Sequence, residues 1–150
     1  MTERIDIAEL APKAYQAMFG LEKYLHGSGL EQRHIELIKL RASQINGCAF
    51  CVDMHSGDMK KQGEPDRRIW AVAAWRETSF FTPEERAVLA LTEEGTRLAD
   101  AHEGVSDEVW AEAEKYFSPE QMAALCMAVA TINAWNRLGV MPRKAPPPLA

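Results

Sequence analysis

Helix start signals recur along the chain, and they constrain its fold more than any other feature. Two segments, beginning TPEE and SPEQ, open with the same device. Thr82 and Ser118 can each serve as an N-cap, a proline follows at the first helical position, and Glu85 or Gln121 stands at the third. This arrangement is a capping box, which satisfies backbone amides that a helix start otherwise leaves unpaired. Both segments are therefore predicted to be helices.

The rest of the chain before the C-terminal tail also reads as helix, divided by glycine and proline. No stretch alternates polar and apolar residues for long enough to suggest a strand. We therefore expect an all-α fold, a single-domain helical bundle of six to seven helices over residues 1–140. The tail at 141–150, MPRKAPPPLA, is predicted to be extended and either loose or laid on a neighbour. The expected helices span about residues 11–26, 31–45, 48–62, 64–78, 82–100, 106–117 and 118–139.

Composition and charge exclude several classes of partner. The chain has 150 residues, of which 47% are hydrophobic, enough for one compact domain. Its formal net charge of -5 argues against a nucleic acid or an anionic membrane as a partner, because either requires a basic face. The N-terminal residues include early acids and no long apolar run, which predicts neither a signal peptide nor a membrane span. A cytoplasmic location is the resulting expectation.

The last expected helix is apolar on nearly all sides from Met122 to Ile132. This run is too short to cross a bilayer, but it suits a bundle centre or a subunit interface, so a homo-oligomer is expected. Cys126 lies inside the run. We interpret it as a small buried apolar residue rather than as a reactive thiol.

The segment NGCAFCVDMH, residues 46–55, concentrates side chains that can do chemistry. On a helix, Cys48 and Cys51 lie roughly 60° apart, and His55 lies roughly 40° from Cys51 one turn along. Gly47 should break the preceding helix and place Cys48 at the start of the next. There the free amides and the helix dipole stabilise a thiolate. In a reducing compartment, such a pair is more typical of catalysis or metal binding than of a structural disulfide.

Two further residues could control the protonation of these thiols. His55 could act as a base toward Cys51 or as a cation beside its thiolate. On a largely apolar helix, Glu36 forms one stripe with Leu40 and Ser43, and this stripe ends near Cys48. The Glu36 carboxylate could therefore relay a proton or orient the imidazole. Taken alone, Glu36 would more often be a solvated helix residue. His55 alone would more often lie on the surface, or in the core with its hydrogen bonds made. A structural zinc site would need four ligands, and the sequence has no second Cys-x-x-Cys to complete one, so no metal is expected.

Four aromatic residues raise a separate question about substrate binding. They could line an apolar pocket for an organic substrate, but at such spacings they more often belong to the core. These residues are Trp70, Trp75, Phe80 and Phe81.

The run ELIKLRASQINGCAFCVDMH resembles the signature of the alkylhydroperoxidase D-like (AhpD-like) core of the carboxymuconolactone decarboxylase family. Its spacing is a glutamate, eleven residues, Cys-x-x-Cys, three residues and a histidine. The flanking HGSGLEQRHIELIKL and TINAWNRLGV also look like the family, so the resemblance covers about residues 10–140. It implies an all-helical fold that assembles into trimers or hexamers.

The resemblance also implies a thiol peroxidase mechanism that needs no bound cofactor. Cys51 would attack the peroxide, Cys48 would resolve the sulfenic acid into a disulfide, and His55 with Glu36 would relay the proton. The reductant would be a dithiol such as a dihydrolipoamide-type carrier, and a peroxiredoxin could be the partner. The best-known family member has a histidine immediately before its nucleophilic cysteine, where this chain has Phe50. The relay is therefore expected to be shorter here, or the peroxidase activity weak.

The leading hypothesis is thus an enzyme, a thiol-dependent alkyl hydroperoxide reductase or disulfide reductase. One alternative is a non-redox decarboxylase or lyase that uses Glu36 and His55 as acid and base. Another is a non-enzymatic thiol redox sensor.

Overall fold

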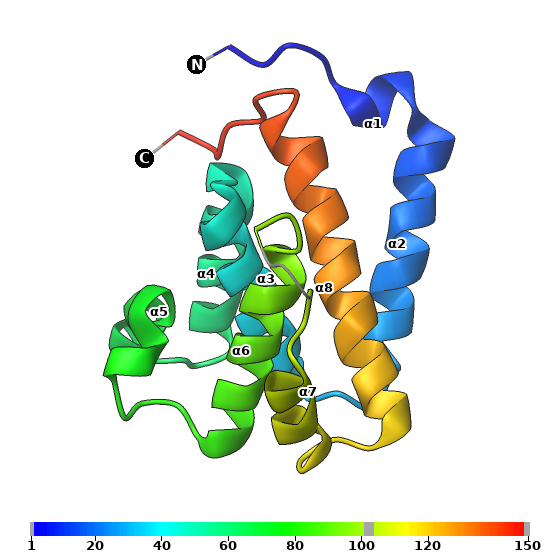
Figure 1. The fold of residues 1–150 in the computed structure, drawn as a ribbon. Helices are drawn as coiled ribbons and strands as arrows, with labels where there is room; N and C mark the ends of the chain where they lie inside the picture. Colours follow the sequence, from blue (N-terminus) through cyan, green and yellow to red (C-terminus); the bar gives the residue numbers. More distant parts are fainter. Residues whose placement is uncertain (1, 101–103, 149–150) are drawn as a thin grey trace.

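Helices account for nearly all regular structure in the computed structural model, which describes residues 2–100 and 104–148 (Figure 1). This part of the chain contains eight α-helices, one 3₁₀ helix and no strand, so the predicted all-α class is confirmed. The helices are α1 (Ile7–Leu10), α2 (Pro12–His26), α3 (Gln32–Asn46), α4 (Ala49–Lys61), α5 (Asp66–Ala71), the 3₁₀ helix η1 (Val72–Glu77), α6 (Pro83–Thr96), α7 (Asp107–Glu114) and α8 (Pro119–Val140).

Most helix boundaries fall within a residue or two of the predicted ones because local signals set them. Both capping boxes form, at Thr82 and at Ser118, with the side chains and amides bonded reciprocally. Two parts of the helical structure differ from the prediction. The four-residue α1, which the Asp6 side chain caps, was not predicted, and the expected helix over 64–78 divides into α5 and η1, with non-helical angles at Ala74.

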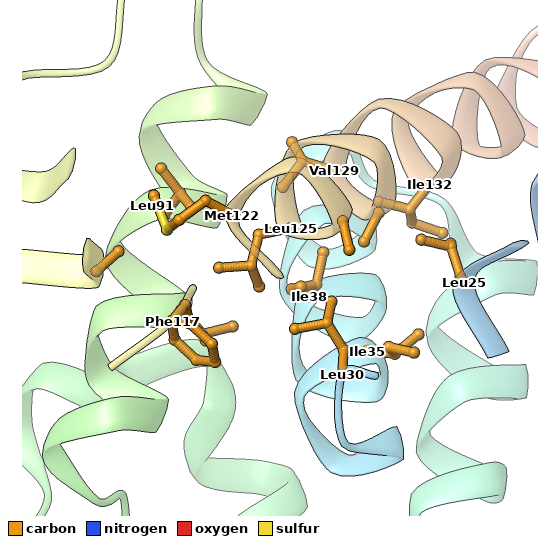
Figure 2. Packing of buried hydrophobic residues seen from close by; sticks show 14 of the residues in the cluster. Leu25, Leu30, Ile35, Ile38, Leu91, Phe117, Met122, Leu125, Val129 and Ile132 are labelled. Carbon is orange, nitrogen blue, oxygen red and sulfur yellow. The ribbon is translucent and has the colours of Figure 1, made fainter. Parts of the chain in front are cut away.

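Helix α3 lies at the centre of the bundle and packs against α4, α6 and α8 (Figure 1). Its buried face includes Ile35 and Ile38, which join residues of α6 and α8 in the larger core cluster. Figure 2 shows Ile38 beside Leu125 of α8, with Ile35 nearer to Leu30. A central helix that is buried on most sides can bring polar residues to the interior, and α3 does so with Glu36, Lys39 and Ser43.

A second core cluster joins α3, α4 and α6 to the α5–η1 segment. Trp75 and Phe81 belong to it, as the core interpretation predicted. Trp70 and Phe80 do not, since they are 72% and 36% exposed. Neither core cluster contains an ionisable residue, and all four aromatic residues lie away from the cavity described below.

The outer face of α8 differs from its prediction at one position. Cys126 is exposed, together with Met127, whereas Leu125 and Ala128 are fully buried. The apolar run therefore covers the core with one face and leaves the other on the surface of the protomer. Among the described residues, no helix is both long and apolar enough to cross a membrane.

The tail begins where α8 ends and, over residues 144–148, is non-helical, as predicted. It turns back beside the N-terminal segment (Figure 1), where the Arg4 amide donates to the Pro142 carbonyl at 2.8 Å. Arg143 adopts a left-handed conformation with φ of 63°, and the Lys144 amide donates to the Gly139 carbonyl at 2.9 Å. These bonds fix the first residues of the tail against the body of the protein.

Candidate functional site

The cysteine pair occupies the predicted place at the start of a helix. Gly47 ends α3 in a left-handed conformation with φ of 67°, which glycine adopts without strain. Cys48 is then the N-cap of α4, and its sulfur accepts a hydrogen bond from the Cys51 amide at 3.3 Å. The two cysteines form a disulfide and are both buried, with 2% and 3% exposure. A sulfur at this position receives the amide hydrogen bonds and the dipole that favour a thiolate.

Glu36 and His55 meet beside this pair, although 19 residues separate them in sequence. Both are buried, and His55 Nδ1 lies 2.9 Å from Glu36 Oε2. When Nδ1 donates its proton to the carboxylate, Nε2 keeps a lone pair that can accept a proton. His55 lies one turn after Cys51 on α4, so the imidazole is placed as a base for the thiol.

A chain of hydrogen bonds extends from this pair to the protein surface. Gln32 Nε2 donates to Glu36 Oε1 at 2.8 Å, and Gln32 Oε1 lies 2.9 Å from His26 Nδ1. Because both carboxylate oxygens of Glu36 are engaged, the orientation of that side chain is fixed. Gln32 is thus a positioning residue that sequence reasoning missed; its only signal is that it stands one helical turn before Glu36.

A cavity of about 660 Å³ opens onto Cys51, His55 and Glu36. Its aromatic wall comes from Tyr15 and Phe19 of α2 and from Trp135 of α8, which stack edge to face or tilted with centroids 5.1 to 5.7 Å apart. The other residues that line it include Phe50, Met54, Ile132, Leu138, Gly139 and Pro142, and the charged Glu3, Asp6, Glu22, Lys39, Asp58, Lys61 and Lys144.

The aromatic wall is therefore a different set from the four residues weighed in the sequence. Tyr15 and Trp135 are 120 positions apart, and although Trp135 belongs to the family-like segment TINAWNRLGV, nothing in the sequence links it to Tyr15. The wall is held by a polar contact, since Trp135 Nε1 donates to Glu22 Oε1 at 2.9 Å, while Lys39 pairs with the other oxygen of that carboxylate. Such a cavity, mostly apolar with a few polar groups, is typical of small-molecule sites.

Helix α8 approaches the disulfide unusually closely at Gly139. A Cβ built at this position would lie 2.9 Å from Cys48 Sγ and 3.6 Å from Cys51 Sγ. Two residues of the sequence signature hold the end of α3 against α8: Asn136 Nδ2 donates to Ser43 Oγ at 2.9 Å, and Asn46 Nδ2 donates to Asn136 Oδ1 at 2.8 Å. Ser43 and Asn46 thus position the backbone around the cysteines.

One group of side chains near the cysteines has donor atoms suited to a metal. The donor atoms of Glu36, His55 and Asp58 all lie within 4.8 Å of one another. Carboxylate and imidazole donors can bind divalent cations. Here, however, Glu36 and His55 already bond to each other, and Asp58 pairs with Lys61 at 2.8 Å. The hydrogen bonding therefore favours a proton relay over a metal site.

Together, the fold and the site define an all-helical protein with a Cys-x-x-Cys disulfide at a helix start and a buried Glu–His pair beside it. The chain belongs to the carboxymuconolactone decarboxylase family, whose model matches residues 11–94. Its fold is that of the AhpD-like core.

Known relatives agree with this assignment. The uncharacterized protein YdfG of Bacillus subtilis (strain 168) is 39% identical over 140 residues, which cover 93% of this chain and 94% of that protein. A crystal structure from Agrobacterium tumefaciens, of a protein of unknown function described as a candidate antioxidant defence protein AhpD, matches with a TM-score of 0.94 and 40% identity, covering 99% of this chain and 100% of that one. An uncharacterized peroxidase-related protein from Ralstonia eutropha JMP134, with an AhpD core, shares the fold with a TM-score of 0.78 at 20% identity, covering 93% of this chain and 74% of that one.

Proposed function

We propose that this protein is a thiol-dependent peroxidase that reduces an organic hydroperoxide with Cys51 and Cys48. The observation that carries the proposal is the meeting of three features at one cavity: a cysteine pair at the start of α4, the Glu36–His55 hydrogen bond, and space of about 660 Å³ for an organic molecule. The likeness to AhpD-like and peroxidase-related proteins supports the same class of reaction.

The proposed reaction has two steps. First, His55 Nε2 takes the proton of the Cys51 thiol, the thiolate attacks the outer oxygen of the hydroperoxide, and the O–O bond breaks. Cys51 becomes a sulfenic acid, and the proton returns to the alkoxide to give the alcohol. Next, the Cys48 thiolate attacks the Cys51 sulfur, a disulfide forms, and water leaves with the proton of Cys48. Two thiols are oxidised for each hydroperoxide reduced.

An external dithiol then restores the reduced state by thiol–disulfide exchange. A dihydrolipoamide-type carrier is the proposed donor, and a peroxiredoxin is a possible recipient of electrons in place of a free hydroperoxide. Phe50 precedes Cys51 in place of a second proton carrier, so Glu36 and His55 form the whole proposed relay near the thiol.

Assembly into trimers or hexamers stays a prediction from the family. The exposed apolar side chains on the outer face of α8, among them Met127, support it, because such a face is typical of a subunit interface. Mass measurement in solution by light scattering tests this prediction.

Single-turnover oxidation tests the proposed function. Fully reduced protein is mixed with one equivalent of cumene hydroperoxide, and free thiols and intact mass are followed over seconds. We expect the loss of two thiols and about 2 Da, the mark of a disulfide. Cys48→Ser should stop at the sulfenic acid, about 16 Da heavier, and Cys51→Ser should not react.

Cys126→Ser is the matched control, because this thiol lies on the outer face of α8 and does not line the cavity. In this variant, the Cys48–Cys51 pair should be oxidised at the wild-type rate. Consumption of hydroperoxide by Cys51→Ser at the wild-type rate would refute the proposal. Lyase activity that survived the replacement of both cysteines would instead support the alternative in which Glu36 and His55 act as acid and base.

A further inference from the structure

The cavity contains a lysine that forms no ion pair with a carboxylate of the described residues. Three lysines line the cavity. Lys39 pairs with Glu22, and Lys61 pairs with Asp58. Within residues 2–100 and 104–148, Lys144 instead contacts aromatic rings: its Nζ lies 4.6 Å from the Phe50 ring centroid and 6.0 Å from that of Tyr15.

Aromatic faces attract an ammonium group without using its N–H donors. An ammonium held in this way can still donate hydrogen bonds to an anion. Lys144 is half-buried, so an anion bound to it would be partly removed from water, where a charge-assisted hydrogen bond is stronger than at the surface.

The backbone holds Lys144 over the cavity. Arg143 takes its left-handed conformation immediately before it, and the Lys144 amide bonds to the Gly139 carbonyl at the end of α8. Pro142 is buried and accepts a bond from the Arg4 amide (Figure 1). The tail therefore places the Lys144 ammonium group at the cavity, over the ring of Phe50, which precedes Cys51.

The rest of the cavity limits what the anion can be. Tyr15, Phe19 and Trp135 provide an apolar wall that suits a hydrocarbon or aromatic body. Glu3 and Asp6 also line the cavity, and their charges repel a molecule with several negative groups. Lys144 supplies one ammonium group, which can bind one carboxylate of a ligand. A monocarboxylate with an apolar body satisfies both conditions.

We propose that the substrate is a small apolar hydroperoxide that carries one carboxylate, and that Lys144 binds this carboxylate. This inference rests on the proposed peroxidase function for the reaction, but the binding step does not depend on turnover. Lys144 is a specificity-determining residue in this account. Phe50 supports it with its ring, at the position where the best-known family member has a histidine.

The test measures binding of 4-isopropylbenzoate and of the uncharged 4-isopropylbenzamide to the oxidised protein by calorimetry. We expect the wild-type protein to bind the acid about tenfold more tightly than the amide, the ratio expected from one charge-assisted hydrogen bond. Lys144→Gln should abolish this ratio while binding the amide as before. Lys144→Arg should retain it, because the charge remains.

Lys115→Gln is the matched control, since it removes the charge of a lysine that pairs with Glu112 and does not line the cavity. It should leave the ratio unchanged. Equal binding of acid and amide by the wild-type protein, or the same ratio in Lys144→Gln, would overturn the inference. A failed single-turnover oxidation with an intact ratio would instead refute the peroxidase reaction and leave the carboxylate site standing.

Discussion

Gly139→Ala tests the packing of α8 against the disulfide. The added Cβ would lie 2.9 Å from Cys48 Sγ, about 0.5 to 1 Å closer than an unstrained contact. Neither partner can yield easily, because Cys48 is tied to Cys51, and Gly139, the last residue but one of α8, is held by the hydrogen bond from the Lys144 amide to its carbonyl. Overpacking of this kind costs about 1–3 kcal/mol, whereas exchanging glycine for alanine within a helix gains about 1 kcal/mol.

Gly20→Ala separates these two effects. Gly20 lies inside α2, and a Cβ there would meet nothing within 4 Å. This control should stabilise the oxidised protein by up to about 1 kcal/mol, and Gly139→Ala should fall about 1–3 kcal/mol below it in urea unfolding.

A double-mutant cycle assigns the cost to the sulfur atom. In a Cys48→Ala background the close atom is absent, so Gly139→Ala should give about the same gain as Gly20→Ala. If Gly139→Ala stabilised the native protein as much as Gly20→Ala, the close approach of α8 to the cysteines would be refuted.

Two other perturbations test buried polar groups. Gln32→Leu removes the donor to Glu36, so the reaction of Cys51 with hydroperoxide should slow by about tenfold and its pH–rate profile should move; an unchanged profile would contradict the positioning role. His34 is buried, neither ring nitrogen has a hydrogen-bond partner among the described residues, and Glu84 Oε1 lies 3.6 Å from Nε2; burial lowers the pKa of this imidazole. Its contribution to stability is full above about pH 6.5 and is lost as the pH falls toward the lowered pKa, because the unfolded chain then binds the extra proton. The melting temperature should therefore decline below about pH 6.5, and His34→Leu should flatten that decline; an equal slope in both proteins would contradict the assignment.

Sequence reasoning was most reliable where a few neighbouring residues decide the structure. The capping boxes formed as predicted, and Gly47 placed Cys48 at the N-cap of α4. It was least reliable where packing decides, as at Cys126, which lies on the outer face of α8, and at Ala74, where the expected helix breaks. A hydrophobic run shows that a helix is apolar, but not which of its faces the neighbouring helices cover.

The sequence by itself determined the helical class, the helix starts and the placing of two cysteines and a histidine on successive turns, because hydrogen bonds within four or five residues set these features. Only the tertiary structure decided that Glu36 reaches His55, that Trp135 faces Tyr15, and that Lys144 lies over Phe50. Those contacts depend on how α2, α3, α4 and α8 cross. The crossing is fixed by burial summed over the whole core, and no local pattern contains that information.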